Sequence, residues 1–465
     1  MVSAQQEAAQ RSVAFVTLGC AKNEVDTAHM RTRVADAGYV LVDDPEQADA
    51  IVVNTCSFIQ AATEESLEAI FDVAGLPNVQ QGAALIVAGC MPARYGDDLA
   101  GELTEARAFV PCSREDDIAA VIADALGIPA SGDKGAVAPV SSDKAAATPV
   151  LPSGGGAAAR VEGSRAASAA LPAAVSAYVK ISDGCDRFCS YCTIPFIRGR
   201  YHSFPLDDVR AETAALVARG AREIVLIAQD TGRWGADFEE PSTLAALVAT
   251  LAEEFPHTWF RVMYIQPEGL TDELLEAVAG HANVCDYFDI PLQHVDENIL
   301  HAMNRTGSRA DFDALVARVR RALPQATLRT TLIAGFPGET DEQFEDLCAF
   351  VEESDFDYIG VFPYSQEDGT RAAKLPDQVD EDEKTDRAQR LRDLADTVCT
   401  PRIAARIGRE MDVLVEGCEE DGQLFGRAMC QAPEVDGVTY LESGDVGEVR
   451  RVVIQDTLLY EMEGA

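Results

Sequence analysis

The sequence predicts an α/β protein with three folded parts: an N-terminal open parallel α/β sheet, a partial (βα)6 barrel and a small all-β barrel. Strand-like and helix-like segments alternate through residues 1–127 and again through residues 177–400. From residue 401 to 465 the pattern changes to short alternating strands broken by Gly and Asp. Residues 128–176 are rich in Ala, Gly, Ser and Pro and contain no aromatic residue, so they are predicted to form a disordered linker.

The first part contains three strand-like runs, SVAFVTLGC, ADAIVVNTC and AALIVAGC, and each run ends in a cysteine. These residues are Cys20, Cys56 and Cys90, separated by 36 and 34 residues, which is about one βα unit each. Ligand sites of open parallel sheets gather beyond the carboxyl ends of the strands. The three thiols are therefore expected to converge, although they lie far apart in the sequence.

The second part contains six strand-like segments, which predict a partial barrel with its site at the carboxyl ends of the strands. The segments are SAYVKIS, EIVLIAQD, WFRVMYIQ, VCDYFDIPLQ, LRTTLIAG and YIGVFPYS. Directly after the first of them comes CDRFCSYC, which places Cys185, Cys189 and Cys192 in one loop at this end of the barrel. Other side chains that follow predicted strands become candidates for ligand binding.

Charge and cysteine content narrow the possible functions. The chain of 465 residues has a formal net charge of −40, and residues 402–465 hold six Arg, no Lys and fourteen Asp and Glu, a net of −8. Nucleic-acid binding requires basic surfaces, so no direct nucleic-acid binding is expected and a basic partner is favoured. With neither a signal peptide nor a membrane-spanning apolar run, the protein is expected to be cytoplasmic. Six further cysteines are expected to pack as small apolar residues: Cys112, Cys285, Cys348, Cys399, Cys418 and Cys430.

The CX3CX2C spacing of CDRFCSYC predicts an iron-sulfur site with an open position. Three thiolates can hold three corners of a cubane cluster and leave the fourth iron for a ligand that is not protein. A structural zinc site closes with four ligands, and no second CxxC follows this loop. The cysteines at the ends of the N-terminal strands form a second set of three; by themselves they could also be buried thiols.

On these motifs the chain resembles the radical S-adenosylmethionine (SAM) superfamily and, within it, the methylthiotransferases. The resemblance implies a TIM-like radical SAM barrel, a C-terminal TRAM domain, two 4Fe-4S clusters and SAM as cofactors. Cys185, Cys189 and Cys192 would hold the cluster that chelates and cleaves SAM, and Cys20, Cys56 and Cys90 would hold the auxiliary cluster that carries sulfur. One SAM would donate a methyl group to sulfur, and another would supply the radical that removes hydrogen from the substrate.

Two motifs resemble the RimO branch of that family: LGCAKNEVD at residues 18–26 and QAPEVDG at residues 431–437. The resemblance implies addition of a methylthio group to the β-carbon of an aspartate in ribosomal protein S12, which docks on the TRAM domain. An acidic TRAM barrel repels phosphates but attracts a basic ribosomal protein, so charge favours the same branch. A one-electron donor is also implied, and the sequence leaves it unidentified.

Further candidates for SAM or substrate binding lie at other strand ends of the barrel. Gln229 and Asp230 of AQDTG correspond to residues that contact the methionyl amino group in related enzymes, with a helix cap or turn as the alternative. Arg305 of MNRTG could pair with a carboxylate. Gly335 of GFPGET could let the backbone approach adenosine, or could serve only a strand-to-helix turn. YFDIPLQH adds Asp289, Gln293 and His294, the last either catalytic or structural.

Three other functions remain as alternatives. A tRNA adenosine methylthiotransferase would share the clusters, but it is disfavoured by the acidic C-terminal barrel and by LGCAKN. A two-cluster electron carrier would use four cysteines per cluster and would not need a catalytic barrel. A zinc-stapled interaction protein would bind zinc in place of iron.

Overall fold

The computed structural model describes residues 11–128 and 174–465 and divides them into two compact units, which are considered separately. Most of the predicted linker, residues 129–173, lies outside the described residues. Two boundaries proposed from the sequence fall inside secondary structure, because β6 (Ser176–Lys180) begins within the proposed linker and α14 (Glu381–Ala404) continues past residue 400. None of the helices in the described ranges is long and apolar enough to span a bilayer.

The first unit is an open sheet of five parallel strands in the order β2-β1-β3-β4-β5. The central strands are the predicted β1 (Ser12–Thr17), β3 (Ala50–Thr55) and β4 (Ala84–Gly89). Every residue of β3 and β4 is buried, as expected for strands covered on both faces. The sequence analysis missed the short strands β2 (Val40–Leu41) and β5 (Ala108–Pro111) at the two edges.

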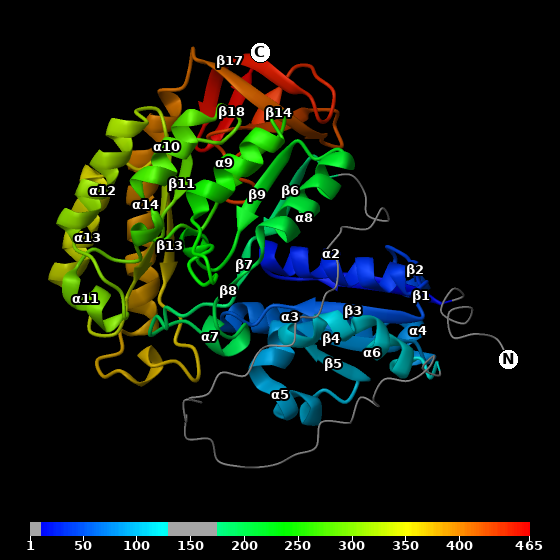
Figure 1. Ribbon diagram of the computed structural model, residues 1–465. Helices are drawn as coiled ribbons and strands as arrows, with labels where there is room; N and C mark the ends of the chain where they lie inside the picture. Colours follow the sequence, from blue (N-terminus) through cyan, green and yellow to red (C-terminus); the bar gives the residue numbers. More distant parts are fainter. Residues whose placement is uncertain (1–10, 129–173) are drawn as a thin grey trace. The chain divides into compact units, whose positions relative to one another are not determined.

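Helices cover both faces of this sheet (Figure 1). Apolar side chains of α2 (Ala21–Asp36) and α6 (Ile118–Ala125) join the core on one face, whereas α3 (Gln60–Ala74) and α5 (Cys90–Glu102) contribute to the core on the other. Short helical segments complete the unit: η1 (Pro45–Gln47), α4 (Pro77–Gln80) and η2 (Cys112–Asp117). The fold is thus the predicted open α/β sheet.

The second unit begins with the predicted partial barrel of six parallel strands, arranged as two three-stranded sheets. One sheet has the order β10-β9-β6 and the other β11-β12-β13. A parallel bridge between Phe260 and Val284 connects them, while β6 and β13 form the two edges. The strands are β6, β9 (Glu223–Ile227), β10 (Trp259–Val262), β11 (Tyr287–Asp289), β12 (Thr327–Ala334) and β13 (Tyr358–Pro363).

Amphipathic helices surround the barrel, and their apolar faces join its strands in one large core. Side chains such as Val209, Leu247, Leu315 and Leu347 meet the buried faces of the strands in this core. The helices are α7 (Ile194–Ile197), α8 (Leu206–Ala218), α9 (Leu244–Glu254), α10 (Asp272–Gly280), α11 (Glu297–Ala302), α12 (Arg309–Ala322), α13 (Asp341–Glu353) and α14. Short segments at the loops are β7 (Ser182–Asp183), β8 (His202–Ser203), η3 (Thr231–Arg233), η4 (Pro267–Gly269) and η5 (Ala372–Lys374).

The C-terminal part is the predicted small β-barrel, closed in the order β14-β15-β16-β18-β17. The strands are β14 (Glu410–Cys418), β15 (Leu424–Ala428), β16 (Thr439–Leu441), β17 (Val449–Leu458) and β18 (Glu461–Gly464). At Gly426 a Cβ atom would lie 2.1 Å from the Leu414 carbonyl oxygen, so only glycine permits this pairing of β14 with β15. Closure leaves no exposed strand edge.

Buried charges attach the small barrel to the strand beginnings of the large one. Glu223, the first residue of β9, accepts a hydrogen bond from Arg261 Nε at 2.8 Å and also pairs with Arg427 of β15. Arg261 donates from Nη1 to the Met429 carbonyl oxygen at 2.8 Å. All three charged side chains are at most 3% exposed. The two barrels are therefore joined by a hydrogen-bonded ionic network rather than by apolar packing alone.

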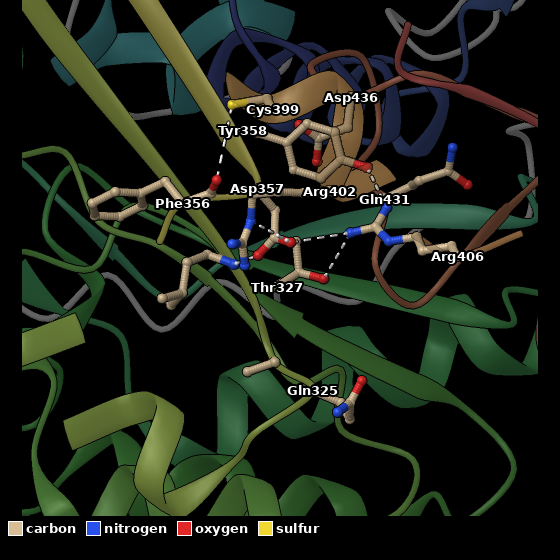
Figure 2. A network of polar contacts seen from close by, with 12 residues as sticks. Gln325, Thr327, Phe356, Asp357, Tyr358, Cys399, Arg402, Arg406, Gln431 and Asp436 are labelled. Atoms are coloured by element: carbon tan, nitrogen blue, oxygen red, sulfur yellow. Dashed lines mark hydrogen bonds and ion pairs between the residues drawn. The ribbon is translucent and has the colours of Figure 1, made fainter. Parts of the chain in front are cut away.

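A second network of the same kind surrounds Arg406, which follows α14 (Figure 2). Arg406 donates from Nη1 to the Tyr358 hydroxyl at 2.9 Å, and its Nη2 lies 3.7 Å from Asp357 Oδ1. Asp436 accepts from the Tyr287 hydroxyl at 2.6 Å. Because Tyr287 and Tyr358 begin β11 and β13, these contacts again lie at the amino ends of the barrel strands.

Candidate cluster-binding sites

The loop CDRFCSYC follows β6 and β7 at the carboxyl end of the barrel, as predicted. Gly184 precedes it with a φ of +73°, and a Cβ there would lie 2.2 Å from the Arg200 carbonyl oxygen. Phe188 also adopts a left-handed conformation, with φ at 49°. Asn304 holds this turn by donating from Nδ2 to the carbonyl oxygens of Arg187 and Phe188, at 3.0 Å and 3.1 Å. The loop is thus fixed by contacts from outside it, which is typical of strained segments at functional sites.

The thiols of this loop fit a metal cluster chemically. Burial raises the pKa of Cys185 to about 11 and the pKa of Cys192 to about 12. A thiolate at these positions therefore requires a nearby positive charge, and a coordinated metal supplies one. Arg305 adds a further cation, because its Nη1 lies 4.0 Å from Cys189 Sγ while its Nη2 donates to the Pro291 carbonyl oxygen at 2.6 Å. Arg305 thus faces the cysteine loop, and its pairing with a carboxylate of a ligand or substrate stays a prediction.

Gln229 and Asp230 follow β9 at the same end of the barrel and present unused hydrogen-bond acceptors. Gln229 donates from Nε2 to Asp183 Oδ1 at 3.0 Å, and Asp230 Oδ2 accepts from Arg187 Nε at 2.7 Å. Gln229 Oε1 and Asp230 Oδ1 are buried, and among the described residues neither has a hydrogen-bond partner. Asp230 stands at the N-cap position of η3, yet its side chain makes no capping hydrogen bond. The geometry thus favours ligand binding over the capping alternative.

The three N-terminal cysteines follow three adjacent strands of the first unit. Cys20 is exposed at the start of α2, whereas Cys56 and Cys90 are 7% and 4% exposed after β3 and β4. Asn23 ties the strand ends together: its Nδ2 donates to the carbonyl oxygens of Leu18 and Thr55, and its Oδ1 lies 3.7 Å from Cys90 Sγ. The sequence analysis did not single out Asn23, although it belongs to the LGCAKNEVD motif.

Neither set of cysteines is arranged around one point. Across residues 11–128 and 174–465, no group of three or more His, Cys, Asp or Glu side chains is placed to hold a single metal ion. A cubane cluster binds each thiolate at a different iron, so it needs more widely spaced thiols than one zinc ion does.

Comparisons with known proteins identify the family. Residues 12–111 match the model described as Uncharacterized protein family UPF0004, residues 179–351 match the Radical SAM superfamily, and residues 407–465 match the TRAM domain. The chain is 39% identical over 458 residues to the ribosomal protein uS12 methylthiotransferase RimO of Trichlorobacter lovleyi. It is 40% identical over 464 residues to the protein of the same name from Geobacter sulfurreducens. Each alignment covers 98% of both chains. This chain belongs to the RimO family.

RimO-family membership also establishes the class of chemistry and of cofactor. The chain is a radical SAM methylthiotransferase, and enzymes of this kind use 4Fe-4S clusters and SAM. Among solved structures it resembles TsrM, a radical SAM methyltransferase from Kitasatospora setae, with a TM-score of 0.54 and 16% identity over 76% of this chain and 72% of that chain. This likeness supports the fold alone.

The remaining candidates of this RimO-family barrel are occupied by internal contacts. Asp289 accepts hydrogen bonds from Arg329 Nη1 at 2.9 Å and from the Tyr264 amide at 3.1 Å. Gln293 adopts a left-handed φ of 74°, and its backbone bonds β12 through its amide and carbonyl groups. His294 is fully buried; its Nδ1 accepts from the Asp296 amide at 3.0 Å, so the proton of the neutral ring sits on Nε2. Its Nε2 is buried 3.4 Å from Glu339 Oε2 and has no hydrogen-bond partner among the described residues, so the catalytic and the structural alternatives both remain.

Gly335 lies in a strand-to-helix turn, and its approach to adenosine stays a prediction. Its φ is +74°, and a Cβ would lie 2.5 Å from Lys384 Cγ. Its amide donates to the carboxylate of Glu339, at 3.0 Å to Oε2. Both the space beside Gly335 and its backbone donor are thus used by the protein itself. Of the rim candidates, Gln229, Asp230 and His294 each have a buried polar atom without a hydrogen-bond partner among the described residues, and Arg305 faces the cysteine loop. Ligand binding by Gln293 and Gly335 stays a prediction.

The TRAM barrel carries an acidic groove of about 400 Å³. We call it the TRAM groove, and it is lined by Glu419, Asp421, Gln423, Tyr440, Leu441, Glu442, Gln455, Glu463, Gly464 and Ala465. Four of these side chains are carboxylates, and the lining contains no Lys or Arg. A groove of this charge attracts lysine and arginine side chains and repels phosphates.

Proposed function

We propose that this enzyme adds a methylthio group to the β-carbon of an aspartate in ribosomal protein uS12. The curated relatives that align over 98% of the chain carry the name ribosomal protein uS12 methylthiotransferase, which supports this substrate. The observation that carries the proposal within the structure is the charge of the TRAM groove. A tRNA substrate would bring phosphates to this domain, and an acidic groove opposes them.

We assign the radical-generating site to the loop of Cys185, Cys189 and Cys192, and the auxiliary site to Cys20, Cys56 and Cys90. When bound, the clusters supply the electron that cleaves SAM and the iron that holds the transferred sulfur. Gln229 Oε1 and Asp230 Oδ1 are the acceptors for the amino group of SAM, because both are buried without a partner among the described residues. Arg187 holds the Asp230 carboxylate in place through the 2.7 Å hydrogen bond to Oδ2.

The function is tested with anaerobically reconstituted enzyme, SAM, sulfide, a reductant and either uS12 or tRNA. Mass spectrometry should detect a methylthio addition on the uS12 aspartate and none on tRNA. Modified tRNA together with unmodified uS12 would overturn the proposal. Cys189→Ala should abolish 5′-deoxyadenosine formation, whereas Cys56→Ala should retain it and lose methylthiolation; identical behaviour of the two variants would contradict the division between the sites.

We further propose that the TRAM groove binds a basic segment of uS12. Reversing two of its charges, in Glu442→Lys with Glu463→Lys, should raise the KM for uS12 at least tenfold and leave SAM cleavage without substrate unchanged. The double variant Glu276→Lys with Glu352→Lys, at exposed acidic residues on α10 and α13, serves as the control matched for net charge. The difference between groove and control variants should shrink as salt is raised, because screening weakens the attraction. Equal KM values for the two would place docking elsewhere.

A further inference from the structure

A fourth cysteine lies beside the three at the strand ends of the first unit. Cys112 directly follows β5, just as Cys90 directly follows β4, and the preceding residues Gly89 and Pro111 are paired in the parallel register of these strands. Cys112 Sγ lies 4.0 Å from Cys90 Sγ. Cys112 was expected to pack as a small apolar residue, but it is half-buried and faces a thiol.

This placement meets the requirements for a disulfide. Paired residues of neighbouring strands are about 4.7–4.9 Å apart across the sheet. A disulfide needs Cα atoms about 4.4–6.8 Å apart. Cys90 and Cys112 come directly after the paired residues Gly89 and Pro111, so their Cα atoms are suitably spaced. The sulfur atoms, 4.0 Å apart here, can approach to bonding distance by side-chain rotation without movement of the strands.

Accessibility sets the order in which the two thiols would react. Cys90 is only 4% exposed, at the start of α5, whereas Cys112 is partly exposed at the start of η2. A small oxidant in solution therefore reaches Cys112 first, and the buried Cys90 reacts second with the sulfur already beside it.

We propose that Cys112 is the redox partner of Cys90, forming a disulfide with it when the N-terminal cluster is lost. A low-molecular-weight disulfide such as oxidised glutathione is the oxidant. The Cys112 thiolate attacks it and releases one glutathione thiolate; the Cys90 thiolate then attacks the Cys112 sulfur and releases the second. Two protein thiols are oxidised, and one glutathione disulfide is reduced to two glutathione molecules. The consequence for cluster assembly rests on the proposed role of Cys90 as a ligand.

The bond itself can be detected without any assay of enzyme activity. The full-length chain, stripped of iron by a chelator, is treated with oxidised glutathione, alkylated and digested with trypsin and a protease that cleaves after glutamate. Trypsin alone leaves Cys56 and Cys90 in one peptide, but cleavage after Glu68 separates them. The expected product links the peptide of residues 69–94 to AFVPCSR, residues 108–114. Linkage should be at least tenfold lower in the holoenzyme, where iron occupies Cys90.

Cys112→Ser provides the second measurement. After oxidation, the wild-type chain should rebind about half of its iron until dithiothreitol is added, whereas oxidised Cys112→Ser should rebind all of it. Cys418→Ser, at an exposed cysteine of the TRAM barrel, is the matched control and should behave as wild type. Glutathione retained on Cys112 without linkage to Cys90 would overturn the proposal. Loss of iron from unoxidised Cys112→Ser would instead identify Cys112 as a cluster ligand and would equally overturn it. Failure of the uS12 assay would leave the peptide linkage unaffected.

Discussion

The ionic network at Glu223 leads to a quantitative prediction about stability. Glu223 is fully buried, and pairing with Arg261 and Arg427 outweighs burial and lowers its pKa from 4.5 to about 2. At about 1.4 kcal/mol for each tenfold change in the dissociation constant, this shift corresponds to roughly 3 kcal/mol of folding free energy. Glu223→Gln removes the charge and leaves two buried guanidinium groups facing an amide. We therefore expect a loss of about 3–5 kcal/mol at pH 7.

Urea unfolding of the apoprotein, followed by tryptophan fluorescence, measures this loss. Both tryptophans of the chain, Trp234 and Trp259, lie in the large barrel, so the signal reports on that fold. With a slope of about 3 kcal/mol per molar urea, the midpoint should fall by roughly 1 M. Glu254→Gln is the matched control, because Glu254 pairs with Arg210 at 2.7 Å on the surface and its loss should have little effect.

The pH dependence provides a further check with a defined sign. A carboxyl group whose pKa is lowered on folding stabilises the protein above its unfolded pKa, and this contribution is lost as the pH falls towards the folded pKa. The difference between wild type and Glu223→Gln should therefore be constant from pH 7 to about pH 5 and should disappear between about pH 4.5 and pH 2. A loss at pH 7 no larger than that of Glu254→Gln would refute the reasoning.

Three other predictions concern the sites and the small barrel. Replacing Arg305 by Met should lower the midpoint potential of the radical SAM cluster by about 59 mV, which is a tenfold change in the equilibrium constant for one electron. Arg305→Lys should have an intermediate midpoint potential. An EPR redox titration measures these potentials, and values equal to wild type for both variants would contradict the prediction. Asp230→Asn should weaken SAM binding in equilibrium dialysis by roughly 10- to 100-fold without loss of iron, since one charged hydrogen bond contributes about 1.5–3 kcal/mol. Gly426→Ala should make the TRAM barrel sensitive to limited proteolysis, because its Cβ would clash with the Leu414 carbonyl oxygen. Gly280→Ala, at the end of α10 with open space around it and no left-handed φ, should remain resistant.

The strands and the positions of six cysteines after strand ends were predictable because each depends on local pattern. Buried apolar runs such as AIVVNT identify strands, and the carboxyl ends of parallel strands necessarily lie together. Cys112 was expected only to pack as an apolar residue, because the four residues of β5 before it are too few and too mixed in polarity to indicate a strand. Its proximity to Cys90 follows from strand order, which periodicity alone does not give.

Long-range pairing accounts for the rest of what the sequence left undetermined. Glu223 and Arg427 are 204 residues apart, and nothing near either residue indicates its partner. At the rim, Gln293 and Gly335 have the residue types of a ligand site, and the structure also places them in a strand bridge and a turn, which the sequence did not indicate for Gln293. The residue type at a strand end thus identifies candidates for ligand binding. Whether a candidate side chain has a polar atom left for a ligand depends on its neighbours in the fold.

The attachment of the TRAM domain to the amino ends of the barrel strands limits what the enzyme can accept as substrate. The cysteine loop follows the opposite ends, and the barrel strands are three to eight residues long. The longest, β12, spans about 26 Å at 3.3 Å per residue. A partner held by both regions must be at least that long, so a fragment of fewer than about eight residues can engage only one of them. Intact uS12 would gain from simultaneous attachment, while minimal peptides around the aspartate would be poor substrates whatever their sequence.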